Sequence, residues 1–224
     1  HKENSFKRYR LNIWTDVASR WISSQVWAAC DKPLPDLKGM QCFGGLDLSK
    51  KIDLTAFAKV FPVGDDYAVL LRCWMPAERV RLREDEDRVP YSQWIREGWI
   101  ETTPGNVVDY SFVQEAIYKD AASYKIETIG FDPYNATETA TRLEHGGVDV
   151  IEFRQGYKSM SAPSRDFEAA VIDGKIIHGN NPVLTWMLGN TMVETDSTEN
   201  IKPSKKHSRQ RIDGVIATIM GLGL

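Results

Sequence analysis

The order of strand-like and helix-like segments constrains the fold of this chain most strongly. Residues 43–48, 54–61 and 67–74 are runs typical of strands, and a turn at Val63-Gly-Asp-Asp joins the last two. Because such a turn returns the chain beside itself, these segments predict an antiparallel meander. The pair Gly44-Gly45 in the first run indicates a bulge or a close approach by another backbone.

Helices and strands alternate in the rest of the chain. Capping signals predict helices beginning at Ser111 and at Asn135, and Gly146 is predicted to end the second of these helices. Residues 126–132 and 148–153 are predicted to form the strands that follow them. The strands reached after these helices are expected to extend the sheet in parallel.

Three further helices are predicted towards the C-terminus. Their signals are Ser164 before an apolar segment, the N-cap pair Asn181-Pro182, and an apolar stripe from Ile212 to Met220 with helical spacing. The whole pattern predicts an α/β fold. We expect a mixed β-sheet of about five strands, an antiparallel meander plus parallel strands, flanked by α-helices.

The composition is that of an ordinary soluble globular protein. The chain has 224 residues, a net charge of −3, and three cysteines without a CxxC pair. We therefore expect neither a disulfide framework nor a zinc site. No apolar run is long enough to span a bilayer and no signal peptide is evident, so we expect no membrane association and a reducing, cytoplasmic setting.

Charge is unevenly distributed along the chain. Glu84, Asp85, Glu86 and Asp87 form an acidic run that we expect in a solvated loop or at a helix end. A basic tract without acids lies just before Asp213. Such a tract beside a candidate metal ligand suits a site that handles phosphate, although a solvated charged loop explains it equally well. The tract contains Lys202, Lys205, Lys206, Arg209 and Arg211.

Asp47 lies within a predicted apolar strand, where aspartate is depleted. A buried carboxylate is costly unless it is paired, hydrogen-bonded or bound to a metal, and this favours a functional role. The alternatives are that Asp47 faces solvent on an edge strand or caps a turn with Ser49.

Two more aspartates occupy comparable positions. Asp132 ends a predicted strand, and ligand sites of open α/β sheets gather at the carboxyl ends of strands. Asp213 is rotated about 100° from Ile212, which places it on the flank of the last apolar stripe. A turn aspartate before proline and an exposed aspartate in a first helical turn are the simpler interpretations.

Asp47, Asp132 and Asp213 together carry more weight than each alone. Their order on the first strand, the strand after the first helix and the last helix resembles the ribonuclease H/integrase superfamily, whose equivalent acids converge at one sheet edge. Packed carboxylates repel one another, and divalent ions relieve that repulsion. Two ions about 4 Å apart can clamp a scissile phosphate, and Mg²⁺ suits ligands that are all oxygen.

Longer motifs give a closer resemblance. Three segments are similar to the nuclease motifs of tailed-phage large terminases, and Phe6-Lys-Arg-Tyr-Arg-Leu-Asn-Ile-Trp is similar to that family's connector between motor and nuclease. The segments are Phe43-Gly-Gly-Leu-Asp-Leu-Ser, Gly130-Phe-Asp-Pro-Tyr-Asn-Ala and Lys205-Lys-His-Ser-Arg-Gln-Arg-Ile-Asp-Gly-Val-Ile-Ala. The resemblance implies a connector over residues 1–40 and a ribonuclease H-like nuclease domain over residues 41–224. The packaging ATPase domain is expected to be absent, because the chain has no GxxxxGK[ST] loop.

The resemblance also implies a function. It is that of a metal-dependent endonuclease that cuts concatemeric viral double-stranded DNA during genome packaging, in the host-cell cytoplasm. Asp47, Asp132 and Asp213 would be the catalytic residues and the ligands of two Mg²⁺ or Mn²⁺ ions. The expected partners are DNA, the packaging ATPase domain, the portal and the small terminase subunit.

Basic residues are the candidate contacts to the DNA backbone, which they would hold without reading bases. They are Lys205, Lys206, His207, Arg209 and Arg211 and, more loosely, Arg154 and Lys158. Asp53 and Glu138 are secondary site candidates. A turn cap explains the first of these two better, and a helix cap explains the second.

Two other functions fit parts of the pattern. A docking module that grips DNA with little cleavage of its own would account for the tryptophan-rich start and the net charge. An actin-like or sugar-kinase ATPase also opens with a Gly-x-Asp strand. It needs further glycine-rich phosphate loops that are not evident in this sequence, so we rank it last.

Overall fold

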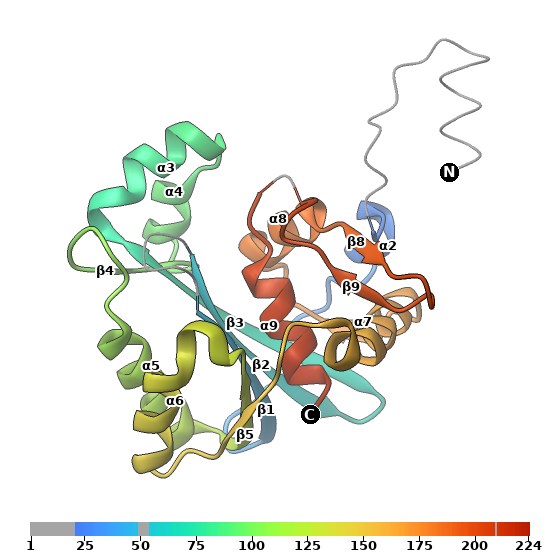
Figure 1. Cartoon of the computed structure of the whole chain (residues 1–224), viewed down its shortest axis with the longest axis horizontal. Helices are drawn as coiled ribbons and strands as arrows, with labels where there is room; N and C mark the ends of the chain where they lie inside the picture. The colour runs from blue at the N-terminus through green and yellow to red at the C-terminus, as the bar shows by residue number, and fades with distance from the viewer. Residues whose placement is uncertain (1–20, 49–53, 209) are drawn as a thin grey trace.

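A mixed seven-stranded sheet forms the centre of the molecule (Figure 1). The structure is a computed structural model that describes residues 21–48, 54–208 and 210–224. The main path of the sheet is β4-β3-β2-β1-β5-β6, and β7 pairs with β3 off this path. The strands are β1 (Gln41–Asp47), β2 (Thr55–Val63), β3 (Asp66–Pro76), β4 (Glu101–Thr103), β5 (Lys125–Phe131), β6 (Val150–Glu152) and β7 (Ile176–Ile177).

The predicted meander and the predicted parallel strands are both confirmed. β1, β2 and β3 pair antiparallel in sequence, and the predicted hairpin closes between Val63 and Asp66. β5 pairs in parallel with β1, and β6 in parallel with β5. The sheet has more strands than expected because β4 and β7, of three and two residues, are too short to show a periodic pattern. A separate hairpin joins β8 (Val193–Thr195) and β9 (Ile201–Pro203).

Helices cover both faces of the sheet, and each face buries its own apolar cluster. α5 (Tyr110–Ser123) and α6 (Pro133–His145) cover one face. The other face carries α2 (Ser24–Ala28), α7 (Tyr157–Ile172), α8 (Pro182–Asn190) and α9 (Asp213–Leu222). Between β3 and β4 lie the 3-10 turn η1 (Ala77–Arg79), α3 (Val80–Asp87) and α4 (Tyr91–Arg96). None of the helices within the described ranges has the length and apolar content needed to cross a membrane.

Several helix boundaries differ from the predicted ones. Asp109, not Ser111, caps α5, because its carboxylate accepts a hydrogen bond from the Ser111 amide. Asp132, not Asn135, caps α6. The capping role predicted for Glu138 is therefore wrong, and its side chain pairs instead with Arg142 one turn later.

The predicted start of α7 at Ser164 is also wrong. α7 begins at Tyr157, seven residues earlier, and contains Pro163 within it. The N-cap of α8 at Asn181 and the end of α6 at Gly146 are confirmed. The acidic run from Glu84 to Asp87 lies at the end of α3, as expected for a helix end.

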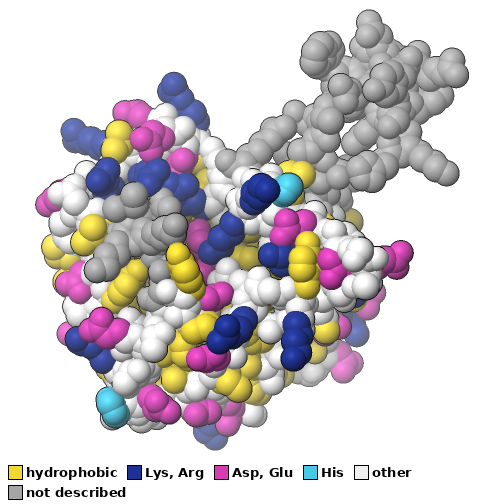
Figure 2. All heavy atoms as spheres, in the orientation of Figure 1, with side chains coloured by type: hydrophobic (Ala, Val, Ile, Leu, Met, Phe, Trp, Pro, Cys, Tyr) yellow, Lys and Arg dark blue, Asp and Glu magenta, His cyan; other side chains and the backbone are white. Residues whose placement is uncertain are grey.

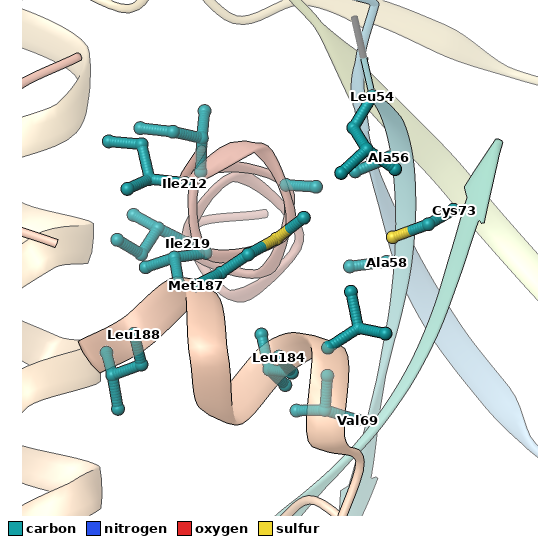
Figure 3. Packing of buried hydrophobic residues seen from close by; sticks show 14 of the residues in the cluster. Leu54, Ala56, Ala58, Val69, Cys73, Leu184, Met187, Leu188, Ile212 and Ile219 are labelled. Atoms are coloured by element: carbon teal, nitrogen blue, oxygen red, sulfur yellow. The ribbon is translucent and has the colours of Figure 1, made fainter. Parts of the chain in front are cut away.

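α9 is buried on all sides. Every residue from Asp213 to Gly221 is buried, so the predicted apolar stripe is only part of a helix surrounded by protein. Figure 3 shows α9 end-on, between the α8 side chains and the strand residues Ala56 and Cys73. A helix in such a position cannot shift without disturbing the core around it.

Close contact between α9 and β1 explains the glycine pair in the first motif. A Cβ atom on Gly45 would lie only 1.9 Å from the carbonyl oxygen of Ala217. The pairing of β1 with β5 also shifts register between Cys42 and Gly44. Both features predicted from Gly44 and Gly45, a close backbone approach and a bulge, are therefore present.

The described residues before β1 pack onto the helical face that carries α7 and α8. The Trp27 indole is 3% exposed, stacks on His178 with 4.1 Å between ring centroids, and donates a hydrogen bond to Thr185. The Trp21 indole donates to Glu168 on α7. This aromatic segment is thus part of the packed structure up to the first described residue.

Candidate metal centre

Asp47 is the last residue of β1, in the middle of the sheet. Side chains alternate along a strand, and Leu46 belongs to the cluster on the α5 and α6 face, so Asp47 points to the opposite face. The residue is 2% exposed. One oxygen lies 2.7 Å from Nζ of Lys205, and the other accepts a hydrogen bond of 2.9 Å from the Gln155 side chain. The alternative in which Asp47 faces solvent on an edge strand is therefore wrong.

Asp213 faces Asp47 across the same ammonium group. It is the first residue of α9 and is 7% exposed, and its Oδ1 lies 3.1 Å from Nζ of Lys205. Burial raises the pKa of Asp213 to about 6; Lys205 lowers it in part, and Asp47 raises it further. The simpler interpretation of an exposed aspartate is wrong, because the first turn of α9 is enclosed.

Lys205 carries the charge that balances these two acids. Burial alone would lower the pKa of Lys205, but Asp47 and Asp213 together outweigh that effect and raise it. The ammonium is therefore positive at neutral pH. Lys205 was predicted to contact DNA, and in the structure its ammonium lies between the two candidate metal ligands.

Asp132 joins the group through Gln155. Its Oδ1 accepts a hydrogen bond from the Tyr134 amide and so caps α6, which agrees with the simpler interpretation of a turn aspartate before proline. Its Oδ2 accepts a hydrogen bond of 3.0 Å from the backbone amide of Gln155. Gln155 therefore connects Asp132 to Asp47, and Lys205 connects Asp47 to Asp213.

The donor atoms suit a hard divalent cation, because all three acids present oxygen. Asp47 and Asp213 already converge on a positive charge, which is the charge that a metal ion would supply. Within the part of the chain that the structure describes, however, no three Asp, Glu, His or Cys side chains are close enough to one another to hold an ion. The three acids have the oxygen donors that a metal ion needs and are linked to one another by Gln155 and Lys205. The Lys205 ammonium lies between Asp47 and Asp213.

Gln155 was not predicted from the sequence. It lies in the loop after β6, beyond the carboxyl end of a parallel strand, and the rule that ligand sites gather there could have singled it out. It also lines a pocket of about 320 Å³ together with Lys202, Lys205 and Lys206. The pocket gives the acidic cluster a polar border with several cations.

The other basic candidates lie at varying distances from the acids. Lys206 borders the same pocket. Nε2 of His207 lies 3.8 Å from Oε2 of Glu194. Arg211 pairs with Asp87 at the end of α3. On α7 and its preceding loop, Arg154 pairs with Glu152, and Lys158 lines a second pocket with Arg165. Arg209 and Asp53 lie outside the described residues.

The mixed sheet, its two helical layers and an acid at the end of β1 define the class of ribonuclease H-like α/β domains. The chain belongs to the family described as the terminase large subunit, endonuclease domain, which it matches over residues 2–224.

Its relatives agree with this assignment. The chain is 34% identical to the large terminase subunit of Enterobacteria phage HK97, covering 99% of this chain and 44% of that protein. It is 30% identical to protein YmfN of Escherichia coli K12, covering 98% of this chain and 51% of that protein. The chain thus spans about half the length of these curated relatives.

Solved structures show the same fold. The crystal structure of the HK97 large terminase superposes with a TM-score of 0.86 at 33% identity, covering 99% of this chain and 47% of that chain. The large terminase nuclease of the thermophilic phage G20c with bound magnesium has a TM-score of 0.56 at 10% identity, covering 93% of this chain and 98% of that chain. The predicted family and the predicted ribonuclease H-like mixed sheet are both confirmed.

Proposed function

We propose that this chain is a divalent-metal-dependent endonuclease that cuts concatemeric viral double-stranded DNA during genome packaging. Asp47, Asp132 and Asp213 are the proposed catalytic residues and the ligands of two Mg²⁺ or Mn²⁺ ions. The observation that supports this site most directly is that the buried carboxylates of Asp47 and Asp213 both contact the Lys205 ammonium. Hydrogen bonds from Gln155 link Asp132 to Asp47.

The use of divalent metal is supported by relatives of the same fold. The G20c large terminase nuclease has been solved with bound magnesium and with bound cobalt. When bound, such ions would stabilise the attacking and leaving oxygens of an in-line displacement at phosphorus. Oxygen ligands on rigid elements suit this task, and here they come from a central strand, a helix cap and a buried helix.

The residues of the chain would have distinct parts in cleavage. Asp47 and Asp213 supply negative charge from inside the core, where few water molecules compete for it. Gln155 fixes one oxygen of Asp47 and one of Asp132. The basic residues would hold the DNA backbone without reading bases. They are Lys206, His207, Lys158, Arg154, Arg209 and Arg211.

We further propose the domain organisation and partners of the intact protein. Residues 1–40 are the connector from a packaging ATPase domain, and residues 41–224 are the nuclease domain. The intact protein would act in the host-cell cytoplasm with the portal and the small terminase subunit. The coverage of about half of each curated relative supports a second domain in the intact protein.

The test is cleavage of duplex plasmid DNA by the chain with Mn²⁺ or Mg²⁺. We expect cleavage that EDTA stops and that Asp47→Asn and Asp213→Asn abolish, because each change removes a charged ligand while keeping the shape of the side chain. Asp166→Asn, at an exposed position on α7, is the matched control and should cut like the unmodified chain. Unchanged cleavage in either site variant would contradict the assignment.

A further inference from the structure

Lys205 occupies the space between the two most deeply buried acids of the site. Its Nζ lies 2.7 Å from Asp47 and 3.1 Å from Asp213. Without a positive charge there, two buried carboxylates would face each other in the interior. Because like charges in a poorly hydrated site repel strongly, some cation is needed to hold this arrangement together.

The Lys205 side chain is well suited to leave that space. It is 45% exposed, whereas the side chains of Asp47 and Asp213 are only 3% and 10% exposed. It also borders the open pocket lined by Lys202 and Lys206. A long side chain at such a position can swing its ammonium into water while the acids stay where the core places them.

Gln155 also contacts Asp47 but, unlike Lys205, carries no charge. Its side-chain amide donates a hydrogen bond to the oxygen of Asp47 that Lys205 does not contact. A divalent ion arriving between Asp47 and Asp213 would therefore meet a group of its own charge that contacts both acids, the ammonium of Lys205.

We propose that Lys205 holds the metal site closed in the absence of metal, and that its ammonium competes with the divalent ion for Asp47 and Asp213. The inference rests on the proposed function, because it assumes that these two acids bind the ion. Lys205 is thus a positioning residue, and it stabilises the metal-free protein at the expense of metal affinity. Its removal should change these two properties in opposite directions.

The experiment measures both properties in Lys205→Met, which keeps the side-chain length and removes the charge. At about pH 8 we expect a lower melting temperature without metal, because the variant lacks the charge that balances the two acids. We expect Mn²⁺ to bind at least about tenfold more tightly by calorimetry, since the ion no longer has to displace an ammonium from the two acids. Lys205→Arg should restore the metal-free melting temperature and the weaker Mn²⁺ binding.

Lys119→Met is the matched control, because it removes the same charge from an exposed side chain on α5. It should leave the melting temperature and the Mn²⁺ affinity unchanged. Mn²⁺ binding that is unchanged or weaker in Lys205→Met would overturn the proposal. If the unmodified chain nevertheless binds Mn²⁺ and cuts DNA, only this inference fails. If neither protein binds Mn²⁺, the proposed function fails with it.

A second measurement does not depend on the folding of any variant. Lysines of the unmodified chain are acetylated with a small excess of acetic anhydride, with and without Mn²⁺, and quantified by mass spectrometry. Released from its ion pairs, Lys205 should react several-fold faster in the presence of Mn²⁺, while Lys119 serves as the internal reference. A Lys205 rate that stays the same or falls with Mn²⁺ would overturn the proposal.

Discussion

At the scale of single residues, Gln155 connects two of the candidate ligands through two different groups. Gln155→Ala keeps the backbone hydrogen bond to Asp132 and removes the one to Asp47. We expect cleavage at saturating Mn²⁺ to fall about 10- to 100-fold, because residues that orient metal ligands commonly have effects of that size. Single-turnover nicking assays measure it, with thermal unfolding to show that the fold is kept. A rate equal to that of the unmodified chain would mean that Asp47 needs no such support.

His178 makes the stability of the protein depend on pH. It is 2% exposed, and its Nε2–H donates to the Trp27 carbonyl. Burial lowers its pKa below the ordinary value of 6.5. Between the lowered pKa and 6.5 the unfolded chain binds more protons at this residue, so the free energy of unfolding falls as the pH falls through that range.

The prediction is that His178→Gln loses less stability on acidification than the unmodified chain. Melting temperatures between about pH 7.5 and about pH 5 measure the effect, since this window contains the titration of ordinary histidine. His145→Gln, at an exposed position, is the control and should follow the unmodified chain. Parallel curves for all three proteins would assign the acid sensitivity to other groups.

The residue pattern predicted part of the candidate site. An aspartate inside an apolar strand and one beside an apolar helical stripe suggested burial, and Asp47 and Asp213 are indeed buried. The contact of Gln155 with Asp47 and the position of Lys205 between the acids could not be predicted in the same way. A glutamine in a loop and a lysine in a basic tract look like solvated residues until the packing of β1, α9 and the pocket brings them to the acids.

At the scale of elements, β1 and α9 approach so closely that one methyl group should separate them. Gly45→Ala would place its Cβ against the Ala217 carbonyl, which is backbone and cannot rotate away. We expect a loss of at least about 3 kcal/mol in the free energy of unfolding, the upper end for overpacking. Urea denaturation of the variant measures it.

Gly189→Ala is the control for this substitution. Gly189 lies in α8, and a Cβ atom there meets nothing within 4 Å. Alanine in an open helical position stabilises, so this variant should be neutral or slightly more stable. Equal effects of the two substitutions would show that the approach of β1 to α9 is looser than described.

Elements with strong local signals could be predicted, and the others could not. The meander, the N-cap of α8 and the glycine end of α6 each follow from a turn or a cap that acts within a few residues. α7 did not follow, because Pro163 is tolerated inside a helix whose apolar side packs on α9 and β9. β4 and β7 pair with β3 over two or three residues, and only the tertiary structure determines such short pairings.

At the scale of the whole molecule, the distribution of charge bears on how the chain would bind DNA. The net charge is −3, and Figure 2 shows Lys and Arg side chains interspersed with Asp and Glu over the face it presents. The isolated chain should therefore bind duplex DNA weakly, through a few phosphate contacts, and gain affinity as salt is lowered from about 200 to about 50 mM. Fluorescence anisotropy with a labelled duplex in Ca²⁺ measures this. Tight binding that salt does not alter would point to contacts other than phosphate.

The enclosure of α9 has a consequence for how cutting could be controlled. Two of the three acids lie on elements in the interior of the protein. Asp47 is on the central strand β1, and Asp213 is on α9, which is buried along its length. Such a frame resists bending, so a change of activity by deforming it would cost much of the protein's stability. In the proposed nuclease, timing would then come from outside these elements, through whatever admits or withholds the nucleic acid strand and the ions.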